Sequence, residues 1–137
     1  MESINCAHTF DNGFENCTSL ETISFPKLKS ITSSFRYAFR NCTALKSVNY
    51  PLLERISSDG FYNAFSGCTG LTRIDFPSLT SVTYKGAFGS SSGVYAFINC
   101  TNLTEIHFRA DAQEVISGLT GYADKWGATN ATIYFDL

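Results

Sequence analysis

The stretch FENCTSLETISF, residues 14–25, recurs three more times along the chain. The later copies are FRNCTALKSVNY at 39–50, FSGCTGLTRIDF at 65–76 and FINCTNLTEIHF at 97–108. All four fit the phrase FxNCTxLxxIxF, with Gly67 replacing the asparagine once and Val48 and Tyr50 as apolar exchanges in the second copy. Self-similarity at a nearly fixed period is typical of repeat architectures, in which stacked coils bury a continuous core. The sequence therefore predicts a solenoid.

The cysteines of the four copies are separated by 25, 26 and 32 residues, which suits one strand, a turn and a return segment in each coil. Alternating apolar residues predict one short strand per copy, paired in parallel with its neighbours. These strands are expected near 20–25, 45–50, 71–76 and 103–108. Proline follows each of the first three strands, and because it fixes its own backbone and lacks an amide donor, we expect a corner there. Beyond the corners, apolar residues recur at one offset and predict a second extended side: Ile31, Ile56 and Val82.

The segment that closes each coil, such as residues 35–42, predicts a single helical turn. Phe10, Phe35 and Phe61 each precede a repeat phenylalanine by four residues, which indicates a second inward stack of rings. Cys6 lies eight residues before Phe14, as Ile31 lies eight before Phe39. The chain is therefore expected to begin inside a coil.

The last thirty residues break the pattern. Asp111, with Glu114 three residues later, predicts the capped start of a helix. Apolar residues then recur at helical spacing, and Gly127 is the expected stop. They are Val115, Ile116, Leu119, Tyr122, Ala123 and Trp126. A final strand is predicted at 131–135. We expect residues 1–110 to form a solenoid of about four coils, and 111–137 a helix-then-strand cap of the same domain.

Composition narrows the classes of partner. The 137 residues are 44% hydrophobic and 16% charged, as in globular domains, and the net charge of −2 gives no basic field for a nucleic acid. No apolar stretch approaches the roughly 20 residues that span a bilayer, and the first residues do not read as a signal sequence. We therefore expect neither a nucleic-acid nor a membrane partner, and the sequence itself gives no localisation.

The repeat resembles the BspA-like, or Treponema-type, leucine-rich repeats of bacteria over roughly residues 6–108. The likeness rests on the phrase FxxCxxLxxIxFP, which the second copy carries as Phe39, Cys42, Leu45, Val48, Tyr50 and Pro51. The resemblance implies a leucine-rich-repeat solenoid with a protein-binding or adhesive role, on the cell surface or secreted. The fourth copy lacks the proline, and its coil is the longest.

Cysteine and asparagine residues can indicate metal binding or glycosylation, but their positions in the repeat favour structural roles. Four of the five cysteines share one repeat position, which predicts a buried column of reduced thiols packed as small hydrophobes. No CxxC pair is present, so we expect no metal site and no cofactor. Five asparagines stand in N-x-Thr contexts that resemble glycosylation sites, yet three recur with the repeat. We interpret those three as turn residues whose side chains bond the backbone nearby.

An enzyme is not expected. The chain has two histidines, His8 and His107, and neither HExxH nor a phosphate-binding glycine loop. Parallel stacking places Asp75 beside His107 on a solvent-facing column, with no nucleophile to complete a triad. We interpret them as an exposed charge pair and predict no catalytic residues.

Two surfaces are candidate ligand sites. The first is the outward face of the repeat strands, a mixed-charge surface that equally fits a solvated face. Its residues are Thr22, Ser47, Arg73 and Glu105 in one column and Ser24, Asn49, Asp75 and His107 in the other. The second is the glycine- and serine-rich insertion at 85–93 with its flanking aromatics Tyr84, Phe88 and Tyr95, which either recognise a ligand or join the core.

The sequence leaves two functional hypotheses. One is a recognition module that binds a protein or glycan through the strand face. The other is an assembly protein, associated with a surface or a phage particle, that docks or self-associates end to end through its uncapped N-terminal coil, because exposed strand edges invite pairing.

Overall fold

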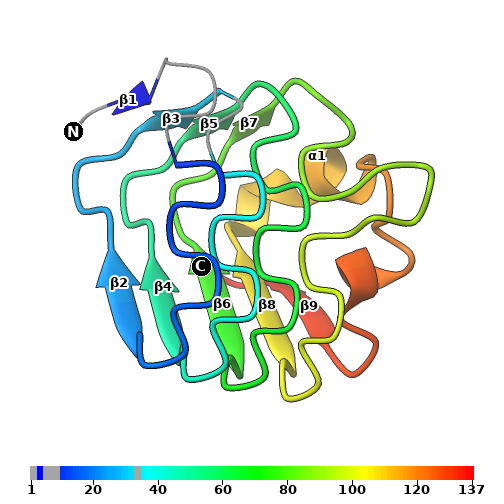
Figure 1. Cartoon of the computed structure of the whole chain (residues 1–137). Coiled ribbons are helices and arrows are strands. Elements are labelled where there is room, and N and C mark those ends of the chain that lie inside the picture. The colour runs from blue at the N-terminus through cyan, green and yellow to red at the C-terminus, as the bar shows by residue number, and fades with distance from the viewer. Residues whose placement is uncertain (1–2, 5–9, 33–34) are drawn as a thin grey trace.

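The chain winds into a parallel β-solenoid of about four coils (Figure 1). The structure, a computed structural model, describes residues 3–4, 10–32 and 35–137. The expected position of Cys6 inside a coil, and His8, lie outside the described residues. The repeat solenoid predicted from the sequence is confirmed.

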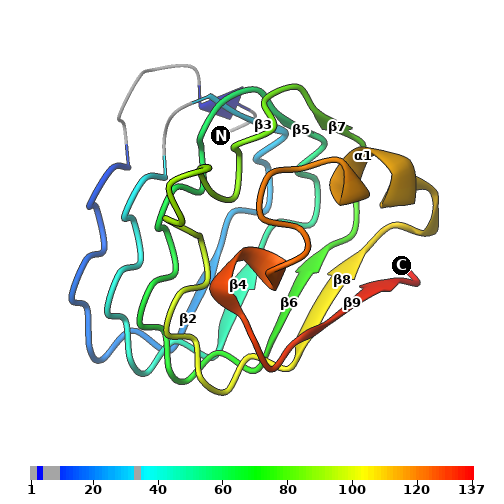
Figure 2. The same ribbon diagram turned by 90° about the vertical axis from the view of Figure 1, so that its right-hand side faces the viewer.

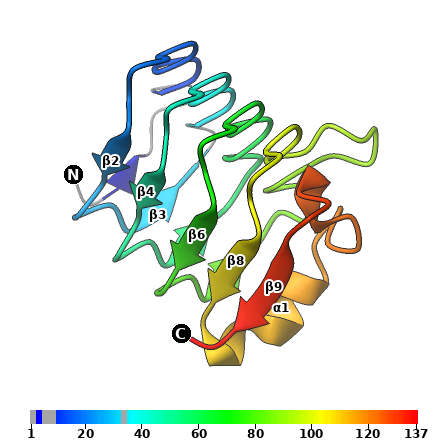
Figure 3. The ribbon, with the colours of Figure 1, turned by 90° about the horizontal axis from the view of Figure 1, so that it is seen from below.

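Each coil has two extended sides, as predicted. The first carries the repeat strands, which lie in a stepped row in Figure 3: β2 (Thr22–Ser24), β4 (Ser47–Asn49), β6 (Arg73–Phe76), β8 (Glu105–Phe108) and, from the C-terminal segment, β9 (Thr132–Phe135). The second side is one four-stranded parallel sheet of β1 (Ser3–Ile4), β3 (Ser30–Ile31), β5 (Arg55–Ile56) and β7 (Ser81–Val82). Proline turns the corner between the two sides.

The register of the coils is the one that the repeat phrase predicts. Arg73 lies opposite Glu105, and the main-chain N–H of Glu54 donates to the carbonyl of Lys29 at 2.9 Å, one coil away. The predicted pairing of β4 with β6, however, is wrong, because the strands of the first side form two separate sheets, β2–β4 and β6–β8–β9.

A difference in the core accompanies this break. The rings behind the strands are 5.3 Å apart from Phe25 to Tyr50 and from Phe76 to Phe108, but 6.2 Å apart from Tyr50 to Phe76. Tyr50 stands where the other copies have phenylalanine, and its hydroxyl is an extra buried atom in the stack. The widest of these three steps therefore coincides with the loss of ladder bonds between β4 and β6.

The third side of each coil is a string of tight turns rather than the predicted helical turn. In the second coil the N–H groups of Ala38, Arg40 and Cys42 each bond the carbonyl three residues back, at 3.1, 3.2 and 3.1 Å. The intervening N–H groups bond the next coil: that of Phe39 donates to the carbonyl of Ala64 at 2.8 Å, and that of Asn41 donates to the carbonyl of Ser66 at 2.7 Å. Because alternate amides serve different coils, a regular helix cannot form.

Positive φ angles hold these turns. The repeat asparagines Asn16, Asn41 and Asn99 have φ near +60°, and Gly67, their replacement, has φ +75°. Asparagine and glycine are the residues that adopt this region most readily. The prediction of turn residues is confirmed, but backbone conformation is the reason, and the side chain of Asn41 donates to that of Asn16 rather than to the backbone.

The core consists of rings stacked along the solenoid. Phe14, Phe39, Phe65 and Phe97 repeat at 5.4 Å, and the predicted second stack of Phe10, Phe35 and Phe61 is confirmed. That second stack continues to Phe88, which is fully buried. The prediction of Phe88 as a ligand-binding residue is therefore wrong. The insertion places Phe88 nine positions before its repeat phenylalanine, Phe97, whereas Phe10, Phe35 and Phe61 stand four positions before theirs, so the offset did not identify it.

The cysteine column is confirmed for three coils. Cys42, Cys68 and Cys100 are buried free thiols, each donating to a main-chain carbonyl of the preceding coil, whereas Cys17, in the first described coil, is exposed. Burial raises the pKa of Cys100 to about 12 and that of Cys68 further. The thiols therefore stay protonated and pack as apolar groups.

The C-terminal segment covers one end of the coils, the end that Figure 2 faces. The single long helix predicted for this segment from the sequence is not observed. A 3-10 turn at Ala110–Ala112 leads into α1 (Gln113–Ser117), and a second 3-10 turn follows at Lys125–Gly127. The helix ends at Gly118, and Gly121 then takes φ +83°.

The predicted cap residue does not act as one. Asp111 makes no capping bond, and its carboxylate accepts two hydrogen bonds from Arg109 at 2.8 and 2.7 Å. The predicted final strand is confirmed as β9, which extends the row of strands by pairing with β8.

Candidate functional site

The outward residues of the first side form two aligned columns, here called the ladder face. In β2 and β4, Thr22 pairs with Ser47 and Ser24 with Asn49. In β6 and β8, Arg73 pairs with Glu105 and Asp75 with His107. The structure therefore brings together the eight strand residues predicted from the sequence, although in two sheets rather than one.

Strand β9 adds two residues to the ladder face that the sequence analysis missed. Thr132 extends the column of Glu105, and Tyr134 extends the column of His107. The repeat phrase is absent from this strand, so the register could not be inferred from it. The alternation of Thr132 and Tyr134 with Ile133 and Phe135 was the available signal.

The ladder face changes character along the solenoid. At the N-terminal half Thr22, Ser24 and Asn49 are exposed, uncharged side chains. At the C-terminal half the guanidinium of Arg73 donates from Nε to Asp75 Oδ1 at 2.7 Å and from Nη1 to Glu105 Oε2 at 3.4 Å. Exposed pairs of this kind add little stability, so their main effect is to fix where the charges lie.

His107 is not solvent-facing as predicted, since only 4% of it is exposed. The ring of Tyr134 stacks on the imidazole at 4.6 Å between centroids. Nδ1 lies 2.7 Å from Asp136 Oδ1 and Nε2 lies 2.8 Å from Glu105 Oε2. Asp75 is opposite His107 in register, but its carboxylate accepts from Arg73 instead. The predicted carboxylate–imidazole pair is therefore replaced by an imidazole between two other carboxylates.

This environment favours the imidazolium form. Burial is the largest single influence on the pKa of His107 and lowers it, but the hydrogen bonds to Asp136 and Glu105, together with the charge of Asp136, outweigh burial and the charge of Arg73, so the pKa lies above its ordinary value. In the charged form both ring nitrogens donate, one to each carboxylate. The cluster of Arg73, Asp75, Glu105, His107 and Asp136 is here called the charged cluster.

The insertion in the fourth coil is an ordered hairpin. Gly89 and Tyr95 form an antiparallel bridge, and the N–H of Ser90 donates to the carbonyl of Val94 at 2.9 Å. The three candidate aromatics separate: Phe88 joins the core, Tyr84 is 50% exposed, and Tyr95 is half-buried beside the C-terminal segment. Phe88 therefore takes the core alternative, and ligand recognition stays a prediction for Tyr84 and Tyr95.

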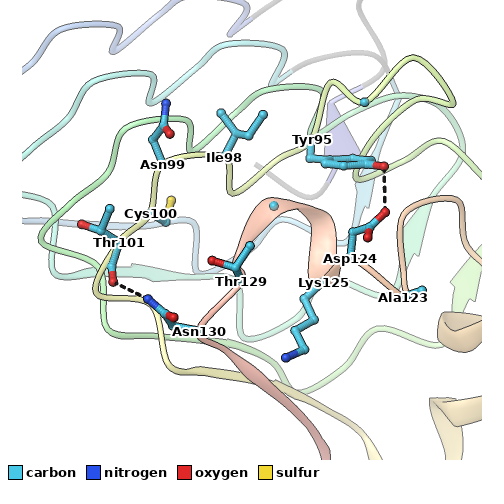
Figure 4. Close-up of a pocket in the computed structure, with 12 residues that line it drawn as sticks. Tyr95, Ile98, Asn99, Cys100, Thr101, Ala123, Asp124, Lys125, Thr129 and Asn130 are labelled. Atoms are coloured by element: carbon cyan, nitrogen blue, oxygen red, sulfur yellow. Dashed lines mark hydrogen bonds between the residues drawn. The ribbon is translucent and has the colours of Figure 1, made fainter.

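Tyr95 lies at the edge of a hollow of about 580 Å³, which we call the end groove (Figure 4). One wall is the turn segment 95–101 and the other is the C-terminal segment 123–130. The polar groups on the two walls include Tyr95, Asn99, Thr101, Asp124, Lys125, Thr129 and Asn130. Apart from Tyr95, the sequence analysis did not include these residues, since only the tertiary fold brings the two segments together.

Among residues 3–4, 10–32 and 35–137, no group of three or more histidine, cysteine, aspartate or glutamate side chains is arranged to hold a metal ion. Within the same described part, no helix has the length and apolar character to cross a bilayer.

Comparisons of the chain with protein-family models, with curated proteins and with solved structures found no match. The fold therefore stands on the repeat phrase and the geometry of the coils, and the family resemblance remains a proposal.

Proposed function

We propose that the chain is a non-enzymatic recognition module that binds a protein or glycan through the ladder face. The observation that carries this proposal is the charged cluster, in which one arginine, one histidine and three carboxylates are held in fixed positions on a row of paired strands. Fixed charges give electrostatic specificity to an interface.

The core behind the ladder face supports the same proposal. The central strands β4, β6 and β8 lie on stacked, fully buried rings, Tyr50, Phe76 and Phe108. A surface that is already ordered loses little conformational entropy when a ligand binds. The neutral half of the ladder face, with its hydroxyl and amide groups, supplies hydrogen-bonding groups beside the charged half.

The proposal includes the family. The fourfold phrase supports a place among the BspA-like leucine-rich repeats of bacteria, and with it an adhesive role on the cell surface or after secretion.

The test compares two double variants that add the same charge on different sides. Ser24→Arg/Asn49→Arg changes two exposed residues of neighbouring coils on the ladder face, and Ser57→Arg/Thr83→Arg changes two exposed residues of neighbouring coils on the other side. Wild-type protein is applied to arrays of glycans and of purified surface proteins, and every binder is measured again with both variants.

We expect binding that the first variant abolishes and the second preserves, and that weakens with salt because charged groups take part. Equal loss in both variants, or in neither, would exclude the ladder face as the binding surface. Binding to the glycan array would identify a glycan ligand, and binding to the protein array would identify a protein ligand.

A second candidate function is assembly through the N-terminal coil. Rings of this coil, Phe10, Phe14 and Phe25, are only half-buried, whereas their counterparts in the central coils are buried. A second copy docking on this end would cover them. The same surface on both copies would give a closed, two-fold dimer.

Light scattering over a concentration range tests this assembly. We expect the mass to rise from monomer to dimer, and Ser19→Glu, at an exposed position of the first coil, to suppress the rise. Ser117→Glu, at an exposed position of the C-terminal segment, is the matched control and leaves it intact. A constant monomer mass at all concentrations would rule the dimer out.

A further inference from the structure

The end groove lies where the main-chain bonding between coils stops. In successive turn segments the amides of the repeat phenylalanine and of the residue two positions later donate to the next coil: Phe39 to Ala64 and Asn41 to Ser66, then Phe65 to Ala96 and Gly67 to Ile98. In the fourth coil Phe97 donates to Trp126 at 2.9 Å. Among the residues that the structure describes, no group accepts the N–H of Asn99, which stands at the groove wall.

The C-terminal segment leaves the fourth coil at this point for a local reason. Lys125, Trp126 and Gly127 have φ of +51°, +49° and +88°, a run that turns the chain sharply. Trp126 is anchored because its buried indole donates to the carbonyl of Thr120 at 3.0 Å. A Cβ on Gly127 would lie 3.0 Å from the backbone of Ile98, so the close approach of the two walls here favours glycine.

The groove is joined across at both ends, as Figure 4 shows. The Tyr95 hydroxyl donates to Asp124 Oδ2 at 3.1 Å on one side, and Asn130 Nδ2 donates to the carbonyl of Thr101 at 3.3 Å on the other. An extended peptide would need an open path past both bonds. The volume is within the roughly 300–1,000 Å³ of small-molecule sites. These two facts favour a short, compact ligand.

The chemistry of the walls indicates which kind. Lys125 and Asp124 carry opposite charges, and Asn99, Thr101 and Asn130 offer amide and hydroxyl groups that donate and accept. Such a lining suits a neutral ligand with several hydroxyls. The amides equivalent to that of Asn99 in earlier coils, those of Asn41 and Gly67, each donate to a carbonyl of the next coil, which indicates that the Asn99 N–H suits a carbonyl acceptor.

We propose that the end groove binds an N-acetylhexosamine unit, with the acetamido carbonyl accepting from the N–H of Asn99. The sugar hydroxyls bond the polar side chains of both walls, and the acetamido methyl faces Ile98. This site goes beyond the ladder face and does not depend on it.

The test is an amide chemical-shift titration of the whole chain with three probes: N-acetylglucosamine, glucose and N-acetylglycine methylamide, a blocked single-residue peptide. We expect N-acetylglucosamine to shift the amides of Asn99, Thr101 and Lys125, and glucose to leave them unchanged. Equal shifts with glucose would overturn the acetamido assignment. Tighter binding of the peptide would make this a peptide site instead, and no shift with any probe would remove the site.

Variants separate this site from the ladder face. Thr129→Arg places a long side chain in the groove from an exposed position, and we expect it to abolish the shifts. Ser117→Arg, exposed outside the groove, and the ladder variant Ser24→Arg/Asn49→Arg should retain them. Retained binding in Thr129→Arg would contradict the assignment to the groove. Because the shifts are mapped first on the wild-type chain, failure of one variant to fold does not prevent a decision.

Discussion

Among the described rings that stack behind the strands, Tyr50 alone carries a polar atom, its hydroxyl. It is buried and makes no hydrogen bond among the residues that the structure describes, and burial raises the pKa of the phenol well above its ordinary value. An unsatisfied buried hydroxyl costs about 1–3 kcal/mol. We therefore expect Tyr50→Phe to raise the free energy of unfolding by roughly that amount, measured by urea denaturation.

Tyr95→Phe is the matched control, since it removes a hydroxyl that does have a partner, Asp124. It should lower stability slightly or leave it unchanged. A loss of stability in Tyr50→Phe would mean that the Tyr50 hydroxyl is bonded, for example to water.

His107 makes stability depend on pH. Its pKa is raised in the folded chain above the ordinary 6.5, so the folded state binds the proton more tightly than the unfolded state. This contribution is fully present below pH 6.5 and is lost as the pH rises through the folded pKa. The carboxylates of Glu105 and Asp136 and the guanidinium of Arg73 are the charged groups that act on it.

Urea midpoints of wild type and His107→Gln between pH 5.5 and 8.5 measure this effect. We expect the stability difference between them to shrink as the pH rises, because the glutamine does not titrate. His8 is present in both chains and cancels. Parallel pH profiles would show that His107 keeps its ordinary pKa.

At the scale of the element, the strength of a coil depends on whether it has a coil on each side. Leu45 is fully buried in a central coil, whereas Leu20 holds the same repeat position in the first described coil and is half-buried. Buried leucine to alanine costs about 2–5 kcal/mol. We expect Leu45→Ala to fall in that range and Leu20→Ala to cost clearly less, by urea denaturation. Equal costs would contradict the stacked-core description.

At the scale of the whole molecule, a solenoid is stabilised by contacts between neighbouring coils and should open from its less covered end. The C-terminal end is covered by Trp126 and β9, while the rings of the first coil stay half-exposed. We expect the amides of Phe14 and Asn16 to exchange with solvent faster than those of Phe39 and Phe65, although all four donate between coils. Uniform protection would indicate that the chain opens as one unit.

The sequence by itself determined the solenoid, its strands, two of its ring stacks and the columns of the ladder face. These features repeat, and each copy of the phrase has the same local geometry. Phe39 or Ile74 could therefore be assigned to the core from its place in the phrase. The corner prolines and turn asparagines followed for the same reason, since their backbone preferences are local.

Only the tertiary structure decided the burial of His107, the core position of Phe88, the broken C-terminal helix and the end groove. Each of these depends on segments far apart in sequence. Tyr134 and Asp136 enclose His107, and the main-chain carbonyl of Trp126 accepts a hydrogen bond from the N–H of Phe97. The cap and the insertion occur once, so no second copy exists against which to align them. The apolar residues of the C-terminal segment do recur at helical spacing. The helix propensity of this segment is low because it contains Gly118 and Gly121, and packing against the fourth coil outweighed it.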